Sequence, residues 1–483
     1  MSSVPCLNLG NCLALDGRGT LAPLLLPAHH LITHAVITGM TGSGKTGLLM
    51  VMVEEALRAG IPVLMIDVKG DLPDLLLAFP TFAPSAFLPW VGEALAPGDP
   101  RTPEELAGQL ALERRQALSA WKIGEPDLSR FEQATSVRVL TPGSTAGETL
   151  HVLSSLEQRS ARWDDDVEAA RSALAAAVSL VLRLLGRDPD PARSREHVLL
   201  SVLAERRLRA GHSAELGALI EDLAHPPIDR VGALGLDAFL PRTERRALAA
   251  ALNGLLASPS FESWRTGALL DVGSWLAPVN GRAPAVIVSV AHLDDEERAL
   301  VLGVVLEEVL AWTRSLGGTQ RLRALCVFDE VFGFVPPHPA NPPTKRPLVA
   351  LMKQARAFGV GVVLATQNPM DLDYRALGNA GTWCVGRLQT DADRARVVDG
   401  LSGSEASLAR TLARAVQKLA PRWFVMRDVH AGPAPFLVQP RWAISWLRGP
   451  MTRTELRKAR TPIASPVLSP TETASPTDDR RTP

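Results

Sequence analysis

The chain has 483 residues, of which 46% are hydrophobic, and its 51 basic residues are balanced by 51 acidic ones. This length exceeds one ordinary core, so we expect two or three domains or one heavily inserted domain. The zero net charge excludes a globally basic nucleic-acid-binding protein, and any contact with DNA must come from local patches.

The cysteines and the apolar segments set the expected compartment. Cys6, Cys12, Cys326 and Cys384 show no metal-ligand spacing and suit a reducing cytosol. The N-terminus carries no basic region followed by an apolar stretch, so no signal peptide is predicted. The longest mainly apolar run, residues 173–182, is shorter than the ~20 residues that a membrane span needs. We therefore expect a cytoplasmic protein without membrane contact.

Taken in chain order, residues 1–30 are rich in glycine and proline and predict an N-terminal arm or an edge strand. An apolar run at 35–38 predicts a strand, and residues 47–57 predict a helix. The octapeptide Gly39-Met40-Thr41-Gly42-Ser43-Gly44-Lys45-Thr46 links them. It fits the P-loop pattern G-x-x-x-x-G-K-[ST] in the strand–loop–helix context that this motif requires.

The P-loop predicts a phosphate site. Its glycines let backbone N–H groups point into one concavity, and the following helix adds its positive N-terminal end. Lys45 should reach the β- and γ-phosphates, and Thr46 should hold Mg²⁺. The predicted nucleotide-binding residues are Gly39, Thr41, Gly42, Ser43, Gly44, Lys45, Thr46 and Gly47.

The next strands are predicted at 63–66 and 137–141, which completes a first core part at 31–159. The first of them ends in Asp67-Val68-Lys69-Gly70-Asp71. Lys69 could contact a phosphate or a neighbouring subunit, or pair with Asp67 or Asp71, and we favour the pairing.

Residues 160–270 differ, because apolar residues recur there at helical spacing among Arg, Glu and Asp. Segments 214–224 and 244–257 show the same pattern. We expect an inserted helical lobe whose charged faces are solvated, with binding to DNA or a partner as the alternative.

The second core part is predicted at 271–460, with a strand at 285–290 and a helix at 294–315. A buried-type strand at 325–328 then ends in Asp329-Glu330. With a P-loop upstream, this indicates a Walker B motif, in which Asp329 holds Mg²⁺ through water and Glu330 polarises the attacking water. The alternative is a plain strand end with solvated acids.

Prolines cluster at 336–347 and predict an irregular loop, followed by a helix at 348–358 and strands at 360–365 and 383–388. Gln367 follows a strand's carboxyl end, where ligands bind in open α/β sheets. Its amide could bond the γ-phosphate and the catalytic water, or simply cap the strand. Residues 461–483 are rich in Ser, Thr and Pro and predict a disordered tail.

Together, the P-loop, residues 67–71, the Walker B motif and the run from Lys353-Gln354-Ala355-Arg356 to Ala365-Thr366-Gln367-Asn368-Pro369 resemble the HerA/FtsK group of P-loop ATPases. The resemblance is strongest to HerA-like, helicase-type ATP-binding proteins and spans residues 30–160 and 280–450. It implies an α/β fold, namely a RecA-like P-loop NTPase core with a largely parallel sheet, into which the all-α lobe is inserted. It also implies a homo-hexameric ring, ATP with Mg²⁺ at subunit interfaces, and translocation of double-stranded DNA through the pore.

The resemblance also suggests roles for single residues. The strand of Gln367 lies between the P-loop and Walker B strands in that group, which suits a γ-phosphate sensor. Residues 379–387 resemble the segment that supplies an arginine to the neighbouring site, so Arg387 is the first candidate and Arg356 the second; surface ion pairing is the alternative. Residues 424–454 resemble a tail that passes over a neighbour's nucleotide site, or else dock on their own core.

Two departures from the group stand out. HerA proper carries an N-terminal β-barrel, whereas only about 30 residues precede this P-loop strand, so ring assembly or partner docking is expected to differ. The neutral charge also means that DNA as substrate follows from the resemblance and not from composition.

Three functions remain open. The first is an ATP-hydrolysing ring motor that translocates on or remodels double-stranded DNA, with a nuclease or another protein as a candidate partner. The second is a P-loop ATPase that remodels or signals to a protein without threading DNA. The third, a non-hydrolysing nucleotide-binding module, is disfavoured by Glu330 and Gln367. The candidate pore loops are residues 332–347, with Lys345-Arg346, and the loop around Pro142.

Overall fold

The computed structural model describes residues 4–91, 100–367, 372–402, 406–432 and 434–460. The predicted disordered tail at 461–483 and the Asn368-Pro369 part of the sensor segment lie outside the described residues. Within the described residues, no helix is both long and apolar enough to cross a membrane.

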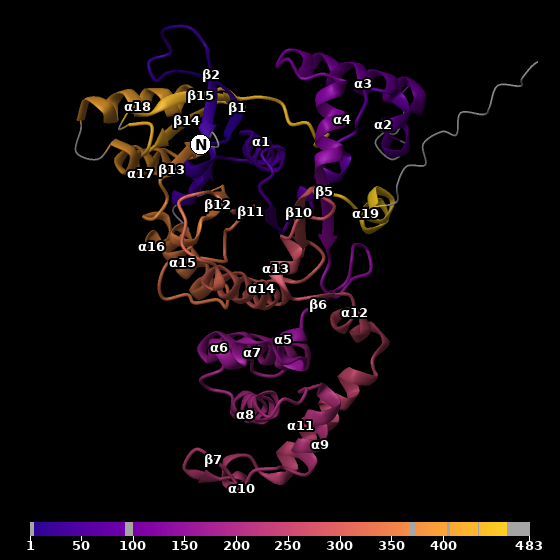
Figure 1. Cartoon of the computed structure of the whole chain (residues 1–483). Helices are drawn as coiled ribbons and strands as arrows, with labels where there is room; N and C mark the ends of the chain where they lie inside the picture. The colour runs from indigo at the N-terminus through magenta and orange to yellow at the C-terminus, as the bar shows by residue number, and fades with distance from the viewer. Residues whose placement is uncertain (1–3, 92–99, 368–371, 403–405, 433, 461–483) are drawn as a thin grey trace, which may run out of the picture.

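A large sheet organises the described part of the chain (Figure 1). It has 11 strands in the order β2-β1-β15-β14-β13-β3-β12-β11-β4-β10-β5. The strands are β1 (Cys6–Ala14), β2 (Ala22–Pro27), β3 (Ala35–Thr38), β4 (Val63–Asp67), β5 (Thr135–Leu140), β10 (Ala283–Ser289), β11 (Ala324–Phe328), β12 (Val360–Thr366), β13 (Thr382–Val385), β14 (Phe424–Asp428) and β15 (Phe436–Pro440).

The stretch of the sheet from β13 to β5 is parallel throughout, and β14, β15, β1 and β2 extend it as an antiparallel edge. A parallel strand is covered on both faces and therefore reads as a continuous apolar run, which is why 35–38, 63–66 and 325–328 were recognisable. The predicted α/β fold with a largely parallel sheet is confirmed.

Alternation along β4 assigns the two faces of the sheet. Leu64 and Ile66 join a core cluster that contains helix α14 (Asp295–Ser315), whereas Met65 joins the cluster that contains helix α1 (Lys45–Arg58). Because successive side chains of a strand point to opposite faces, α1 and α14 cover opposite sides of the sheet. The P-loop helix is thus held on a fully buried, two-sided scaffold.

The inserted lobe lies below the core in Figure 1, with α14 between it and the sheet. Its longer helices are α7 (Val167–Leu184), α8 (Arg195–Arg209), α9 (Leu216–Ala224) and α11 (Arg242–Ala257). Helix α7 packs on α14, and Arg162 of the short helix α6 (Arg162–Asp165) donates to Glu308 of α14 at 2.6 Å. A short hairpin of β7 (Arg230–Val231) and β8 (Leu234–Gly235) adds to the helices. The domain boundaries themselves stay predictions.

The remaining elements connect these parts. They are η1 (Ala28–Thr33), η2 (Leu72–Leu77), α2 (Pro84–Val91), α3 (Pro103–Ser119), α4 (Glu125–Ala134), β6 (Leu150–His151), α5 (Ser154–Glu157), α10 (Leu236–Phe239), η3 (Pro259–Phe261), α12 (Glu262–Arg265), β9 (Ala268–Leu269), α13 (Val272–Trp275), α15 (Lys345–Gln354), η4 (Ala355–Phe358), α16 (Tyr374–Leu377), α17 (Asp391–Ser402), α18 (Ala406–Lys418) and α19 (Arg453–Arg460).

Two predicted boundaries are wrong by three residues, and several others by one or two. Helix α15 begins at Lys345, inside the proline-rich segment, because Pro347 falls in the first turn, where a missing N–H costs no hydrogen bond. Strand β13 ends at Val385 instead of at 388, since Gly386 and Arg387 turn toward the P-loop.

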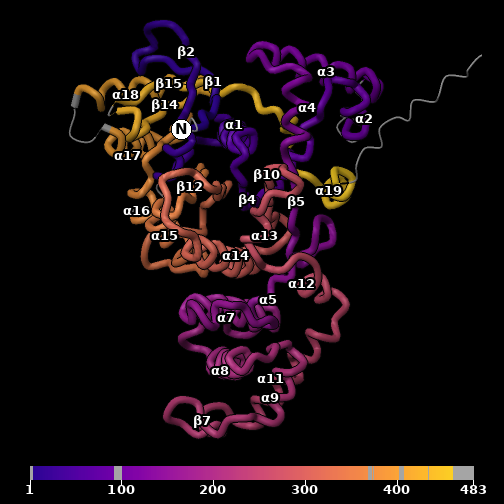
Figure 2. Tube along the Cα trace, in the orientation of Figure 1, coloured from indigo at the N-terminus to yellow at the C-terminus, as the bar shows by residue number. Residues whose placement is uncertain are grey.

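The last described segment returns to its own core, and Figure 2 shows it running from β15 to α19 beside the α2–α4 layer. The buried Arg441 donates at 2.9 Å to both Glu54 and Glu55 of α1. Glu54 also accepts from the amides of Ile444 and Ser445 at 2.8 Å. At 441–445 the structure favours docking on the chain's own core over passage across a neighbour.

Candidate nucleotide site

The P-loop follows β3 at the carboxyl edge of the parallel sheet and leads into α1. Gly44 caps α1 with φ 96°, a left-handed conformation that a side chain would strain. A side chain at Gly39 would bring its Cβ within 2.6 Å of the Ser43 hydroxyl. Because the first amides of a helix have no intrahelical acceptor, those at Lys45–Gly47 are available to an anion.

The P-loop residues fit a phosphate group in two further respects. The Ser43 hydroxyl is buried and has no hydrogen-bond partner among the described residues. The buried Lys45 ammonium donates to the carbonyl oxygen of Gly39 at 2.5 Å and to that of Met40 at 3.3 Å. Burial lowers the pKa of Lys45, and the nearby Glu330 carboxylate partly opposes that shift.

Asp329 and Glu330 follow β11 at the same sheet edge. Asp329 is buried, and this burial raises its pKa to about 6, against the lowering effect of Lys69. The Glu330 backbone adopts φ 55°, which is uncommon outside glycine. Residues in such strained conformations cluster at functional sites.

A chain of hydrogen bonds joins the P-loop to the Walker B segment. Thr41 Oγ1 donates to Gln367 Oε1 at 3.2 Å, and Gln367 Nε2 donates to Glu330 Oε2 at 3.3 Å. Lys69 Nζ donates to the same Glu330 oxygen at 2.6 Å. Lys69 after β4 and Gln367 after β12 therefore both donate to the Glu330 carboxylate after β11, and Thr41 of the P-loop is linked to it through Gln367.

This convergence corrects the prediction for Lys69, which pairs with Glu330 and not with Asp67 or Asp71. Asp67 is instead bound by the Ser289 hydroxyl at 2.7 Å and the Gly70 amide at 2.8 Å. Proximity in sequence misled the prediction, because β4 and β11 are neighbouring parallel strands whose ends meet.

The two candidate arginines lie at opposite edges of the sheet. The Arg387 carbonyl accepts from the Met40 amide at 2.7 Å, so its exposed side chain starts beside the P-loop of its own chain. Arg356 lies in η4, just before β12 begins, at the amino edge. The roles of both residues, and of Thr46 and Asp329 toward Mg²⁺, stay predictions.

Arg422 is a site residue that sequence reasoning missed. Its amide donates to the Ser43 carbonyl at 2.9 Å, and its guanidinium lies 3.3 Å from the ring centroid of Trp442. Burial lowers the pKa of Arg422 to about 10. Only the pairing of β14 with β13 brings Arg422 to the P-loop, so no local motif could reveal it.

The candidate pore residues carry less free charge than expected. Lys345 pairs with Asp373 at 3.1 Å, and Arg346 pairs with Glu307 at 2.7 Å. The predicted basic patch at 345–346 is therefore largely neutralised within the chain.

The fold and this site define a P-loop protein of the α/β class. Residues 18–79 match the family model described as Helicase HerA-like C-terminal. The comparison with curated proteins gives no match. Among solved structures, the bacterial conjugative coupling protein TrwBdeltaN70 is similar at 14% identity and TM-score 0.50, with 92% of this chain and 91% of that chain covered.

Two further solved structures are similar at lower scores. VirB4 of Thermoanaerobacter pseudethanolicus shows 13% identity and TM-score 0.49, with coverage of 91% and 96%. The plasmid coupling protein TrwB in complex with ADP and Mg²⁺ shows 14% identity and TM-score 0.48, with coverage of 88% and 89%. The resemblance to the HerA/FtsK group of P-loop ATPases is confirmed. The family model matches the region of the P-loop, and the comparison with TrwBdeltaN70 shows a similar fold.

Proposed function

We propose that this protein is an ATP-hydrolysing ring motor of the HerA/FtsK type, which couples hydrolysis to translocation on, or remodelling of, double-stranded DNA. The observation that carries the hydrolytic part is the convergence of Gln367 and Lys69 on Glu330, with Gln367 also bonded to Thr41 of a complete P-loop. The family-model match over residues 18–79 supports the type.

The side chains divide the work of hydrolysis. Lys45 would exchange its two carbonyl acceptors for β- and γ-phosphate oxygens, and Thr46 and Asp329 would hold Mg²⁺, whose charge offsets that of the phosphates. Glu330, oriented by Lys69 and Gln367, would polarise the attacking water. Gln367 also contacts Thr41 of the P-loop, so it would report the γ-phosphate to the Walker B segment.

A homo-hexamer in the cytoplasm is part of this proposal. The nucleotide would lie at a subunit interface, with Arg387 or Arg356 neutralising transition-state charge. A cation supplied by a neighbouring subunit is worth roughly 10³–10⁵ in turnover. Arg356, at the amino edge, lies on the side of the sheet that faces away from its own P-loop.

One observation favours the second candidate function, a P-loop ATPase that acts on a protein partner without threading DNA. Lys345 and Arg346 are paired with Asp373 and Glu307. Because movement along DNA depends on contacts between free cationic side chains and backbone phosphates, this neutralised segment should bind a duplex only weakly.

The test compares the ATPase rate with and without duplex DNA at low salt. Glu330→Gln protein serves as the control for background hydrolysis. We expect duplex of any sequence to raise the ATPase rate. In a binding assay, a plot of the logarithm of the DNA binding constant against the logarithm of the salt concentration should fall with a slope of about −0.9 for each phosphate neutralised. Hydrolysis that ignores DNA would reject the DNA motor and leave the protein-directed ATPase.

A further inference from the structure

A groove lies beside helix α18, on the antiparallel edge of the sheet. Helices α17 and α18 cover one face of this edge (Figure 1). A row of paired residues crosses the same face from β13 to β1, namely Val385, Val425, Leu437 and Leu13. The two valines are fully buried, whereas the two leucines are only half-buried. The sheet therefore extends beyond its helical cover, and the groove lies where that cover ends.

The floor of the α18 groove is apolar. Leu13, Leu15, Trp423 and Leu437 line it, and the walls are α18 on one side and the turn between β1 and β2 on the other. Its volume of about 740 Å³ is enough for several side chains of a ligand. Strand β1 is already paired with β15 on one side and with β2 on the other, so the groove cannot accept a further strand. An occupant must bind through its side chains.

The rim of the α18 groove is cationic. Arg18 of the turn and Arg414 and Lys418 of α18 line it, and Asp16 is the one carboxylate among the lining residues. All three cations are exposed. Arg18 approaches Asp16 only to 4.0 Å, and Arg414 and Lys418 form no ion pair with a described residue. Four residues apart, these two lie on the same face of the helix. Positive charge above an apolar floor is complementary to a partner that is both acidic and apolar.

The α18 groove is also in contact with the P-loop through one residue. Helix α18 ends at Lys418, and Arg422 follows just before Trp423 of the groove floor. The Arg422 amide donates to the Ser43 carbonyl at 2.9 Å, and a Cβ added to Gly44 would lie 3.0 Å from the Arg422 side chain. A ligand that displaces Trp423 or the end of α18 would therefore move a residue that contacts the P-loop directly.

We propose that the α18 groove docks an acidic amphipathic helix of a partner protein, and that its occupancy regulates ATP turnover at the P-loop. A helix satisfies its own backbone hydrogen bonds, as a groove without a free strand edge requires. Its apolar face would cover Leu13 and Leu437, and its acids would meet Arg414 and Lys418. A nucleic-acid strand would use the cations, but its phosphate backbone would leave the leucines exposed to water. The regulatory part rests on the proposed ATPase function, whereas the docking does not.

The first experiment finds the ligand without assuming its sequence. Random 12-residue peptides displayed on phage are selected on the full-length, nucleotide-free protein. We expect the enriched peptides to combine Asp or Glu with apolar residues at helical spacing. The tightest one is then synthesised with a fluorescein label, and its binding is measured by fluorescence anisotropy. A scrambled peptide of the same composition tests whether the spacing matters beyond the charge, and a labelled 12-residue oligothymidylate tests a nucleic-acid strand.

The decisive variant combines Arg414→Glu with Lys418→Glu. Because it places like charges opposite the acids of the peptide, binding should weaken at least about tenfold. The matched control is Arg242→Glu with Arg246→Glu, two exposed arginines with the same spacing on α11, and it should bind the peptide as wild type does. Saturating peptide should change the ATPase rate of the wild type and of the control at least about twofold, and should leave that of the groove variant unchanged.

Three results would overturn the docking. They are enrichment of no acidic peptide, equal binding by the groove variant and the α11 control, and binding of the oligothymidylate in place of the peptide. A peptide that binds without changing the ATPase rate would overturn the regulation. If the wild-type chain hydrolyses no ATP, the proposed function fails, and the regulation with it, while the anisotropy measurements still decide the docking.

Discussion

Glu330 leaves β11 with a left-handed backbone, and two polar side chains then donate to its carboxylate. Lys69 holds its carboxylate at 2.6 Å, and Gln367 links it to Thr41 of the P-loop. Glu330 can therefore respond, through Gln367, to a nucleotide bound at the P-loop, while Lys69 keeps its carboxylate in place.

At this scale, binding and hydrolysis should separate. We expect Lys45→Ala to abolish ATP binding at the P-loop, because the P-loop loses its cation. Glu330→Gln should retain binding and lose ~10²–10⁴-fold in turnover, the usual worth of a general base. Equilibrium nucleotide binding followed by phosphate release measures both. The control is Glu132→Gln, an exposed carboxylate on α4. Near wild-type turnover by Glu330→Gln would remove Glu330 as the base.

At the scale of elements, the C-terminal segment is fixed to the core by buried charges. Arg441 bridges Glu54 and Glu55 of α1, and Asp74 of η2 accepts from the Gly449 amide at 3.0 Å. The Arg441 interaction is sensitive to removal of a partner, because a buried charge without one is costly.

Arg441→Ala should lower the free energy of unfolding by about 3–5 kcal/mol, because two buried carboxylates lose their cation. Urea unfolding measures it. Arg441→Met combined with Glu54→Gln and Glu55→Gln should recover much of this stability, because no unpaired charge remains. Arg18→Ala, at an exposed position, should change stability by less than about 0.5 kcal/mol. A decrease under ~1 kcal/mol in Arg441→Ala would contradict the structural role.

Asp74 should make stability depend on pH. Burial raises its pKa from 3.8 to about 8. Because the folded-state pKa is the higher one, its stabilising contribution is complete below about pH 4 and is lost as pH rises to about 8. Asp74→Asn keeps an acceptor for Gly449 and removes the charge.

The variant should therefore match wild type near pH 4 and be more stable at pH 8. The gain should be at least about 1 kcal/mol, given that one pKa unit corresponds to 1.36 kcal/mol. Urea unfolding at both pH values measures the difference, in which titrating groups that do not interact with Asp74 cancel. Equal stability at pH 8 would refute the assignment.

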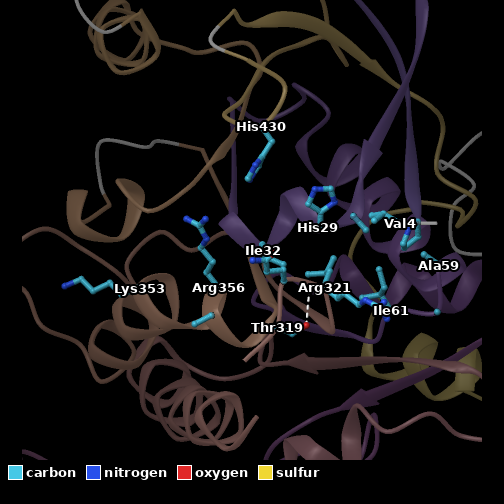
Figure 3. A pocket seen from close by; sticks show the side chains of 16 residues that line it. Val4, His29, Ile32, Ala59, Ile61, Thr319, Arg321, Lys353, Arg356 and His430 are labelled. Carbon is cyan, nitrogen blue, oxygen red and sulfur yellow. Dashed lines mark hydrogen bonds between the residues drawn. The ribbon is translucent and has the colours of Figure 1, made fainter. Parts of the chain in front are cut away.

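At the scale of the whole molecule, the parallel sheet separates the P-loop, at its carboxyl edge, from a pocket at its amino edge that Arg321, Lys353 and Arg356 border (Figure 3). The P-loop and Arg387 lie at the carboxyl edge, and Arg356 and the amino-edge pocket lie at the other. A ring would bring the two kinds of edge together between neighbouring copies.

Mixing Arg387→Ala with Lys45→Ala protein should restore ATPase activity if Arg387 acts across an interface, because mixed rings pair an intact P-loop with an intact arginine. Each single variant alone should lose roughly 10³-fold or more. Arg356→Ala is tested in the same way. No rescue by either arginine variant, together with a monomer by light scattering, would exclude the ring.

Local pattern alone determined the strands at 35–38, 63–66 and 325–328, the P-loop and the Asp329-Glu330 strand end. Buried parallel strands are continuously apolar, and a P-loop needs glycines at fixed spacing. Both features can therefore be recognised from a short segment of sequence. The lobe was readable from its helical periodicity.

The tertiary structure alone decided which distant side chains meet. Lys69 reaches Glu330 because β4 and β11 are neighbours, and Arg422 reaches Ser43 because the antiparallel edge folds back beside β13. Lys345 and Arg346 are neutralised by Asp373 and Glu307 for the same reason. Strand order and helix packing set these pairings, and neither is encoded in the spacing of residues along one segment.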